Sequence, residues 1–201
     1  FIVFETFSIE EVVLSAVKHA LISEDNGFVF NIAHDGVTLI SPSVDALELV
    51  MPNTPATRDR VVFISDTSTT RQCVRCEWQT DFSETSLMDA VLNLYGPQGS
   101  GQVSTTHLSS HSYTELADYL NDITQEQEHA VRNDLLLADW VVFAQLEANE
   151  NRPDAYALKQ LITENPDLLM DKQVVVFSFN APSVLDATEI SNLTAYFSLY
   201  S

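Results

Sequence analysis

Asp66, Glu147 and Asn180 are the residues whose type and position best suit them for chemistry, because each directly follows a long run of β-branched and aromatic residues. Two carboxylates at the ends of neighbouring parallel strands could act as an acid and a base, and glycoside hydrolysis uses such a pair. The alternative is that both carboxylates cap helices or accept hydrogen bonds from turn amides. We favour this second interpretation, because no sugar-binding platform stands beside them in the sequence.

The runs that precede these residues are 61–65, 141–146 and 174–179. None alternates between apolar and polar residues, which is typical of central parallel strands that are covered by helices on both faces. Ligands of such sheets bind beyond the carboxyl ends of the strands. We therefore expect Asp66, Glu147 and Asn180 to line one crevice, for a ligand or a second domain. The residues expected at the opposite edge are Asp59, Asp139 and Lys172.

Helical patterns separate these strands. Residues 83–95 are amphipathic and end at Gly96, while Ser112 and Glu115 form a capping box for a helix to about residue 120. The remaining expected elements are helices over 124–137, from Pro153 to before Pro166 and from Pro182, strands over 37–40, 102–108 and 194–200, and an extended connector over 41–58.

Alternation of strands with helices predicts βαβ units with right-handed crossovers. The expected fold class is α/β, a three-layer sandwich around a mainly parallel, doubly wound, flavodoxin-like sheet. Residues 1–36 are predicted to be a helical lead-in from an upstream domain, and residues 37–201 to be the sandwich domain.

The sequence gives no support for a bound nucleotide. The glycine-rich segment 96–101 connects a helix to a strand, whereas a phosphate loop connects a strand to a helix. A dinucleotide site would need glycine after the first long strand, and residues 67–70 contain none. We therefore expect no cofactor.

Cys73 and Cys76 have the spacing of two zinc ligands, but a structural zinc site needs four. His107 and His111 could supply the others only from a strand end and a helix cap. Free thiols or a local disulfide are the preferred interpretations, and no metal is expected.

The chain carries 29 acidic and 9 basic residues, a net charge of −20. That charge repels phosphate backbones and anionic membranes, so neither nucleic acid nor a membrane is an expected partner. No apolar run approaches the roughly 20 residues that span a bilayer. Because the sequence starts at Phe1, without a methionine, we expect it to be a segment of a longer polypeptide.

The order of several motifs resembles that of a known family. The motifs are Val37–Ile40, the proline-containing connector, Asp59–Asp66, Gln72–Cys76, Asn93–Gln98, Ala138–Phe143, Val174–Pro182 and Leu193–Ser201. Together they resemble the C-terminal α/β domain of family 3 glycoside hydrolases, in particular the β-N-acetylhexosaminidase-like branch.

The resemblance implies an accessory domain of an enzyme that hydrolyses O-glycosidic bonds. In that family the nucleophilic Asp and the acid/base His–Asp pair lie on a separate (β/α)8 barrel, so no catalytic residue is expected in this chain and the isolated domain should be inactive. The implied partners are the upstream barrel of the same polypeptide and carbohydrate at the domain interface. Two alternatives stay open: a stand-alone small-molecule-binding module of flavodoxin-like architecture, and a self-sufficient hydrolase that uses Asp66 and Glu147.

Overall fold

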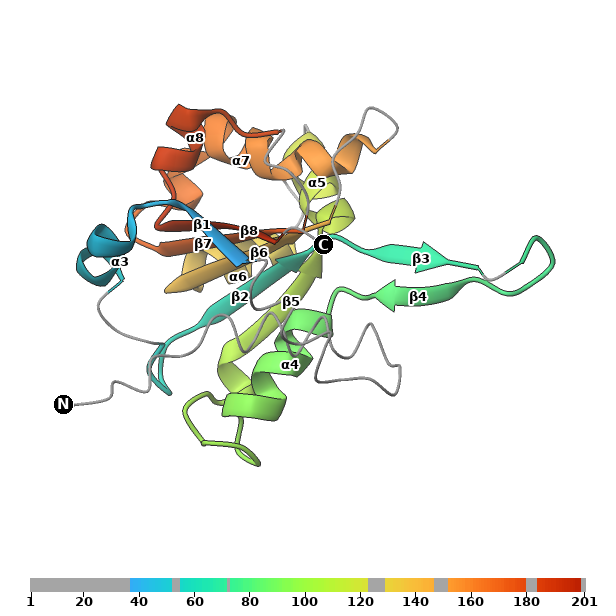
Figure 1. Ribbon diagram of the computed structural model, residues 1–201, viewed down its shortest axis with the longest axis horizontal. Helices are drawn as coiled ribbons and strands as arrows, with labels where there is room; N and C mark the ends of the chain where they lie inside the picture. The colour runs from blue at the N-terminus through green and yellow to red at the C-terminus, as the bar shows by residue number, and fades with distance from the viewer. Residues whose placement is uncertain are drawn as a thin grey trace.

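The three long apolar runs form the centre of a six-stranded sheet (Figure 1). The computed structural model describes residues 37–51, 55–71, 73–122, 129–146, 152–179 and 184–199. Within them the spatial order of the strands is β1-β8-β7-β6-β2-β5. Neighbouring strands from β8 to β5 are parallel, and β1 pairs antiparallel with β8. The strands are β1 Val37–Ser41, β2 Val61–Ser65, β5 Leu108–Ser112, β6 Trp140–Gln145, β7 Gln173–Ser178 and β8 Ala195–Leu199.

The central strands are buried on both faces, as their lack of alternation predicted. Every residue of β2 and β8 is buried. Val62 and Ile64 point into one hydrophobic cluster, whereas Val61 and Phe63 belong to the other. Strands of this kind require a covering layer on each side of the sheet.

Helices supply that cover on both faces. Helix α4 Ser86–Tyr95 packs on the face that includes Phe63, through Leu87, Ala90 and Val91. The other face is covered by α5 Tyr113–Asn121, α6 Ala130–Leu137, α7 Ala157–Glu164 and α8 Ala187–Ser191. Two short 3-10 segments, Pro153–Tyr156 and Pro166–Leu168, flank α7. The arrangement confirms an α/β fold with a mixed, mostly parallel sheet.

Local sequence signals fix several helix ends. The Ser112 hydroxyl accepts from the Glu115 amide and the Glu115 carboxylate accepts from the Ser112 amide, so the expected capping box forms. Helix α4 ends at Gly96, where a Cβ would lie 2.3 Å from the Leu92 carbonyl oxygen. Only glycine tolerates so close an approach, so Gly96 allows the chain to leave the helix at this point.

Two expectations about local structure were wrong or displaced. The connector over 41–58 is not extended throughout, because α3 Val44–Val50 forms within it. The strand expected over 102–108 lies later, at Leu108–Ser112, after a 3-10 turn at Thr105–His107. Its polar sequence hid it: β5 has a single neighbour, β2, and is less buried than the central strands.

Other expectations fall on residues that the structure does not describe. They are the helical lead-in over 1–36, the start of the helix expected from residue 124 and the helix start at Pro182. The described parts of those two helices are α6, from Ala130, and α8, from Ala187.

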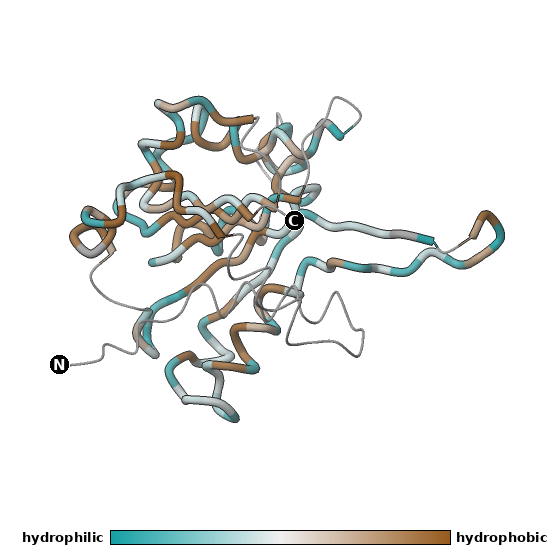
Figure 2. Tube along the Cα trace, viewed as in Figure 1, coloured by the Kyte–Doolittle hydropathy of each residue, from teal (hydrophilic) through white to brown (hydrophobic). Residues whose placement is uncertain are grey.

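A two-stranded arm, which the sequence did not predict, is inserted between β2 and α4. It consists of β3 Ser68–Thr70 and β4 Gln79–Phe82, paired antiparallel, and it projects from the sheet (Figure 1). Figure 2 shows polar colours along the arm and an apolar patch near its tip, in contrast to the apolar strands of the main sheet. Except for Phe82, which ends β4 and belongs to the core, the residues of β4 are exposed, so the arm leaves no hydrophobic alternation in the sequence.

Candidate functional site at the carboxyl edge of the sheet

Asp66 lies where β2 and β6 separate at the carboxyl edge of the sheet. Its amide donates to the Ala144 carbonyl at 2.8 Å, and its Oδ2 accepts from the Leu146 amide at 3.2 Å. The side chain is completely buried. From β2 the chain crosses to β5 on one side, and β6 begins the series β6-β7-β8 on the other. Such a reversal of strand order is the usual binding position in open α/β sheets.

Arg152 binds the Asp66 carboxylate with both terminal nitrogens. Its Nη1 donates to Asp66 Oδ2 at 3.2 Å, and its Nη2 contacts Asp66 Oδ1. The same Nη2 lies 3.5 Å from the Thr67 carbonyl oxygen and 3.9 Å from Asp154 Oδ2. Bidentate pairing of this kind fixes the position and orientation of the carboxylate. Sequence reasoning missed Arg152, although it is a basic residue directly before the expected helix start at Pro153 in a chain with few cations.

Tyr113 brings a second ionisable group to this edge. It is the first residue of α5, its side chain is 1% exposed, and its ring meets Phe143 edge-on with centroids 6.3 Å apart. Among the described residues its hydroxyl has no hydrogen-bond partner. Burial raises the pKa of Tyr113 well above the usual value for tyrosine, and the charges of Asp66 and Tyr196 raise it further. The phenol is therefore held in its neutral form.

A row of buried polar side chains continues along the edge. The last residues of β6 and β7 are Gln145 and Ser178, and the last but one of β8 is Ser198. Ser178 is the register neighbour of both other residues. Each is at most 3% exposed. Gln145 Nε2 donates to the Ala155 carbonyl at 3.4 Å, while Ser65 Oγ has no partner among the described residues. The carboxyl edge is thus polar but enclosed.

The structure locates only one of the three predicted site residues. Asp66 is at the edge, whereas Glu147 and Asn180 lie outside the described residues. Parallel register does bring the preceding residues, Leu146 and Phe179, to the same edge: Phe179 donates its amide to the Gln145 carbonyl at 2.8 Å. Whether the three side chains share one crevice stays a prediction.

The residues expected at the opposite edge are there, and they hold chain turns. Asp139 Oδ2 accepts from the Arg60 amide at 2.8 Å, and Lys172 Nζ donates to the Ala138 carbonyl at 2.8 Å. Asp59 Oδ2 accepts from the Ala56 amide at 2.8 Å.

Cys73 and Cys76 form a disulfide, which is one of the two preferred interpretations. The histidines considered as further zinc ligands make other contacts. His107 Nδ1 lies 3.0 Å from the Thr57 carbonyl oxygen, and His111 Nε2 lies 2.8 Å from Asp134 Oδ2. In the described part of the chain, no group of histidine, cysteine and carboxylate side chains has the arrangement of a metal site.

Comparison with known proteins gives no assignment: no family model, no curated protein and no solved structure matches this chain. Within the described ranges, the structure contains no helix with the length and apolar character that a membrane crossing requires.

Proposed function

We propose that this chain is an accessory, non-catalytic α/β domain that packs against a separate (β/α)8 barrel and helps to shape its active site. The barrel would hydrolyse O-glycosidic bonds of the N-acetylhexosaminide type. The support from sequence is the ordered set of motifs that resembles the C-terminal domain of family 3 glycoside hydrolases. Five of those motifs contain strands of one sheet, β1, β2, β6, β7 and β8, and a sixth forms the end of α4.

We also propose a flavodoxin-like topology. If the parallel strands are numbered in chain order, their spatial order is 2-1-3-4-5, which is the order of that architecture. Its binding position lies between the first and third parallel strands, here β2 and β6. Asp66 and Leu146 follow these two strands and are joined by a hydrogen bond.

One observation carries the non-catalytic role: the Asp66 carboxylate is completely buried and bound through both oxygens. Arg152 donates to each oxygen, and the Leu146 amide donates to Oδ2. A general acid or base must reach the proton that it transfers. A carboxylate held in this way instead keeps the ends of β2 and β6 and the segment that enters α7 in fixed positions, as a domain that supports another site requires.

Activity measurements on the isolated chain test this proposal. We expect no hydrolysis of aryl N-acetylglucosaminides or aryl glucosides, because the nucleophile of the glycosyl intermediate would lie on the barrel. Turnover that disappears in Asp66→Ala or Glu147→Ala would contradict the proposal and support a self-sufficient hydrolase. The coding sequence upstream of Phe1 gives a second test, since a barrel is expected there.

A stand-alone small-molecule-binding module is the second candidate, and the Tyr113 hydroxyl favours it. This hydroxyl is buried and has no partner among the described residues, and the charge of Asp66 contributes to its raised pKa. Such a hydroxyl could donate a hydrogen bond to a ligand. Thermal stabilisation by neutral polyols, lost in Tyr113→Phe, together with an upstream sequence that encodes no barrel, would favour this candidate. If polyols did not stabilise the chain against heat, this candidate would be excluded.

A further inference from the structure

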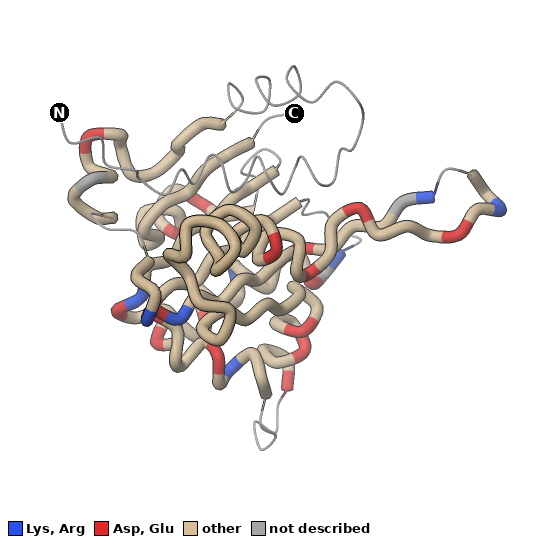
Figure 3. The backbone as a smooth tube through the Cα atoms, turned by 90° about the horizontal axis from the view of Figure 1, so that it is seen from below, with Lys and Arg blue, Asp and Glu red and all other residues tan. Residues whose placement is uncertain are grey.

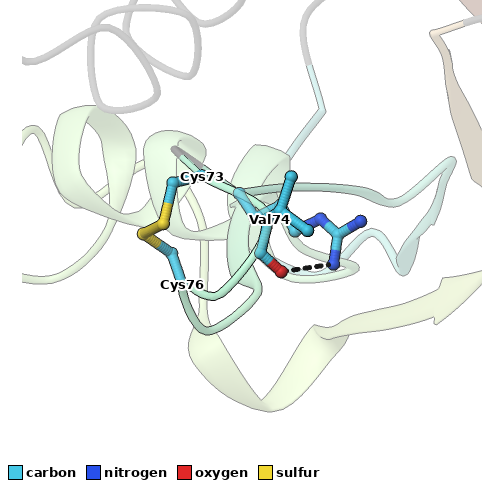
Figure 4. The surroundings of a disulfide bond; sticks show 4 residues. Cys73, Val74 and Cys76 are labelled. Atoms are coloured by element: carbon cyan, nitrogen blue, oxygen red, sulfur yellow. Dashed lines mark hydrogen bonds between the residues drawn. A yellow bond between two sulfur atoms is a disulfide. The ribbon is translucent and has the colours of Figure 1, made fainter.

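The tip of the arm carries a disulfide that is open to attack. Cys73 and Cys76 are the two cysteines of the chain, are three residues apart, and are bonded to each other with their Cα atoms 5.1 Å apart (Figure 4). Both residues are exposed, as is Val74 between them. Thiol–disulfide exchange requires a thiolate to reach one of the sulfur atoms, and the structural disulfides that resist it are mostly shielded.

This disulfide has little to stabilise. A cross-link stabilises a protein mainly by closing a loop in the unfolded chain, and short loops give the smallest gain. Neither cysteine belongs to the two hydrophobic clusters that cover the faces of the sheet. We therefore expect that the fold does not depend on the bond, and that the bond could open and close without unfolding the domain.

The turn also has contacts that would keep the two thiols close after reduction. The Cys76 amide donates to the Cys73 carbonyl at 3.0 Å, and Arg71 Nη1 donates to the Val74 carbonyl at 3.2 Å, the dashed line in Figure 4. The Arg71 guanidinium lies 4.8 Å from the centre of the Trp78 ring, across the arm. In the reduced chain these contacts would keep the turn closed, so that the disulfide could form again within the same chain.

The charge of the tip suits exchange. Arg75 lies between the two cysteines, and Arg71 lies two residues before Cys73, in a chain whose net charge is −20. Figure 3 shows cationic positions at the end of the arm and acidic positions along it. The acidic residue nearest the disulfide in the sequence is Glu77, which follows Cys76. Positive side chains near a Cys-x-x-Cys pair favour the thiolate, both as the attacking species and as the leaving group.

We propose that Cys73–Cys76 is a thiol–disulfide exchange site that reacts with dithiol reductants while the domain stays folded. The attacking thiolate forms a mixed disulfide with one cysteine, and the other cysteine leaves as a thiolate and takes up a proton. The second thiol of the reductant then displaces the first cysteine. The protein disulfide is thereby reduced to two thiols, and the reductant is oxidised to its own disulfide. The inference does not depend on the proposed accessory role.

The test follows reduction of the oxidised chain by dithiothreitol in native buffer, with free thiols trapped by a maleimide and counted by mass. We expect the folded chain to react about as fast as a blocked peptide of residues 71–78 with the same disulfide. Reduction should lower the melting temperature by less than about 4 °C, which corresponds to about 1 kcal/mol in a protein of this size. Reaction only in denaturant, or a larger loss of stability, would overturn the proposal.

Two variants separate the local charge from the total charge. Arg75→Glu should slow reduction several-fold, because the leaving thiolate loses a cationic neighbour. Arg58→Glu changes the net charge equally from an exposed position in another segment, and should leave the rate unchanged. Equal slowing in both variants would show that the arm has no special reactivity. A chain that keeps two free thiols in oxidised glutathione, or that binds zinc stoichiometrically through them, would also overturn the proposal.

Discussion

The two edges of the sheet use polar residues in opposite ways. At the carboxyl edge, Asp66 is completely buried and paired with Arg152, and Tyr113 lies beside it without exposure. At the amino edge, Asp139 is exposed and Lys172 half-buried, and both bind main-chain groups. Burying a charge is costly unless it is paired, whereas an exposed charge that caps a turn costs little. Because a buried charged pair is costly in free energy, its presence at the carboxyl edge indicates that the shape of this edge matters for more than the stability of the fold.

The largest effect is expected from a substitution in the centre of the sheet, between its two edges. Val175 is 2% exposed at the centre of β7, so Val175→Asp places an unpaired charge in the core and should prevent folding. Circular dichroism and the yield of soluble protein measure this. Val142→Asp should be milder than its sequence suggests, because Val142 is only partly buried in β6. If Val175→Asp folded as well as Val142→Asp, the assignment of β7 to the sheet centre would be contradicted.

At the carboxyl edge, Arg152→Ala leaves the Asp66 carboxylate buried without its cationic partner. We expect a loss of about 3 to 5 kcal/mol in the free energy of unfolding, measured by urea denaturation. Asp66→Asn in the same background removes the stranded charge and should recover part of that loss. A loss below about 1 kcal/mol in Arg152→Ala would show that the pair behaves like a surface ion pair.

At the amino edge, Asp139→Ala removes one exposed acceptor from the Arg60 amide. The free energy of unfolding should fall by about 1 kcal/mol, as it does when a capping side chain is lost. The same denaturation experiment checks it. If this variant cost as much as Arg152→Ala, the contrast between the two edges would disappear.

The smallest effect at neutral pH is expected from Tyr113→Phe, within about 0.5 kcal/mol, because the hydroxyl has no partner among the described residues. A difference should develop in alkali. The raised pKa of Tyr113 means that its contribution to stability is complete below the unfolded value near 10 and is lost as the pH rises through the folded value. Wild-type stability should therefore fall more steeply than that of the variant above about pH 10. Parallel alkaline curves would show that the phenol is not held neutral.

The sequence alone determined which strands form the centre of the sheet and which residues lie at the carboxyl and amino ends of those strands. Runs such as 61–65 and 174–179 lack alternation, and only burial on both faces tolerates that pattern. The Ser112 capping box and the stop at Gly96 depend on neighbours three or four residues away, so local sequence predicted them as well. Position beyond a strand end placed Asp66 at the carboxyl edge.

Only the tertiary structure decided the contacts between distant segments. Asp66 and Arg152 are 86 residues apart, and their pairing depends on β2 and β6 being neighbours, which no local pattern encodes. The enclosure of Tyr113 requires α5 and β6 to meet. The arm escaped prediction, and the edge strand β5 was placed too early in the sequence, because neither buries two faces and hydrophobic patterning reports burial rather than backbone pairing.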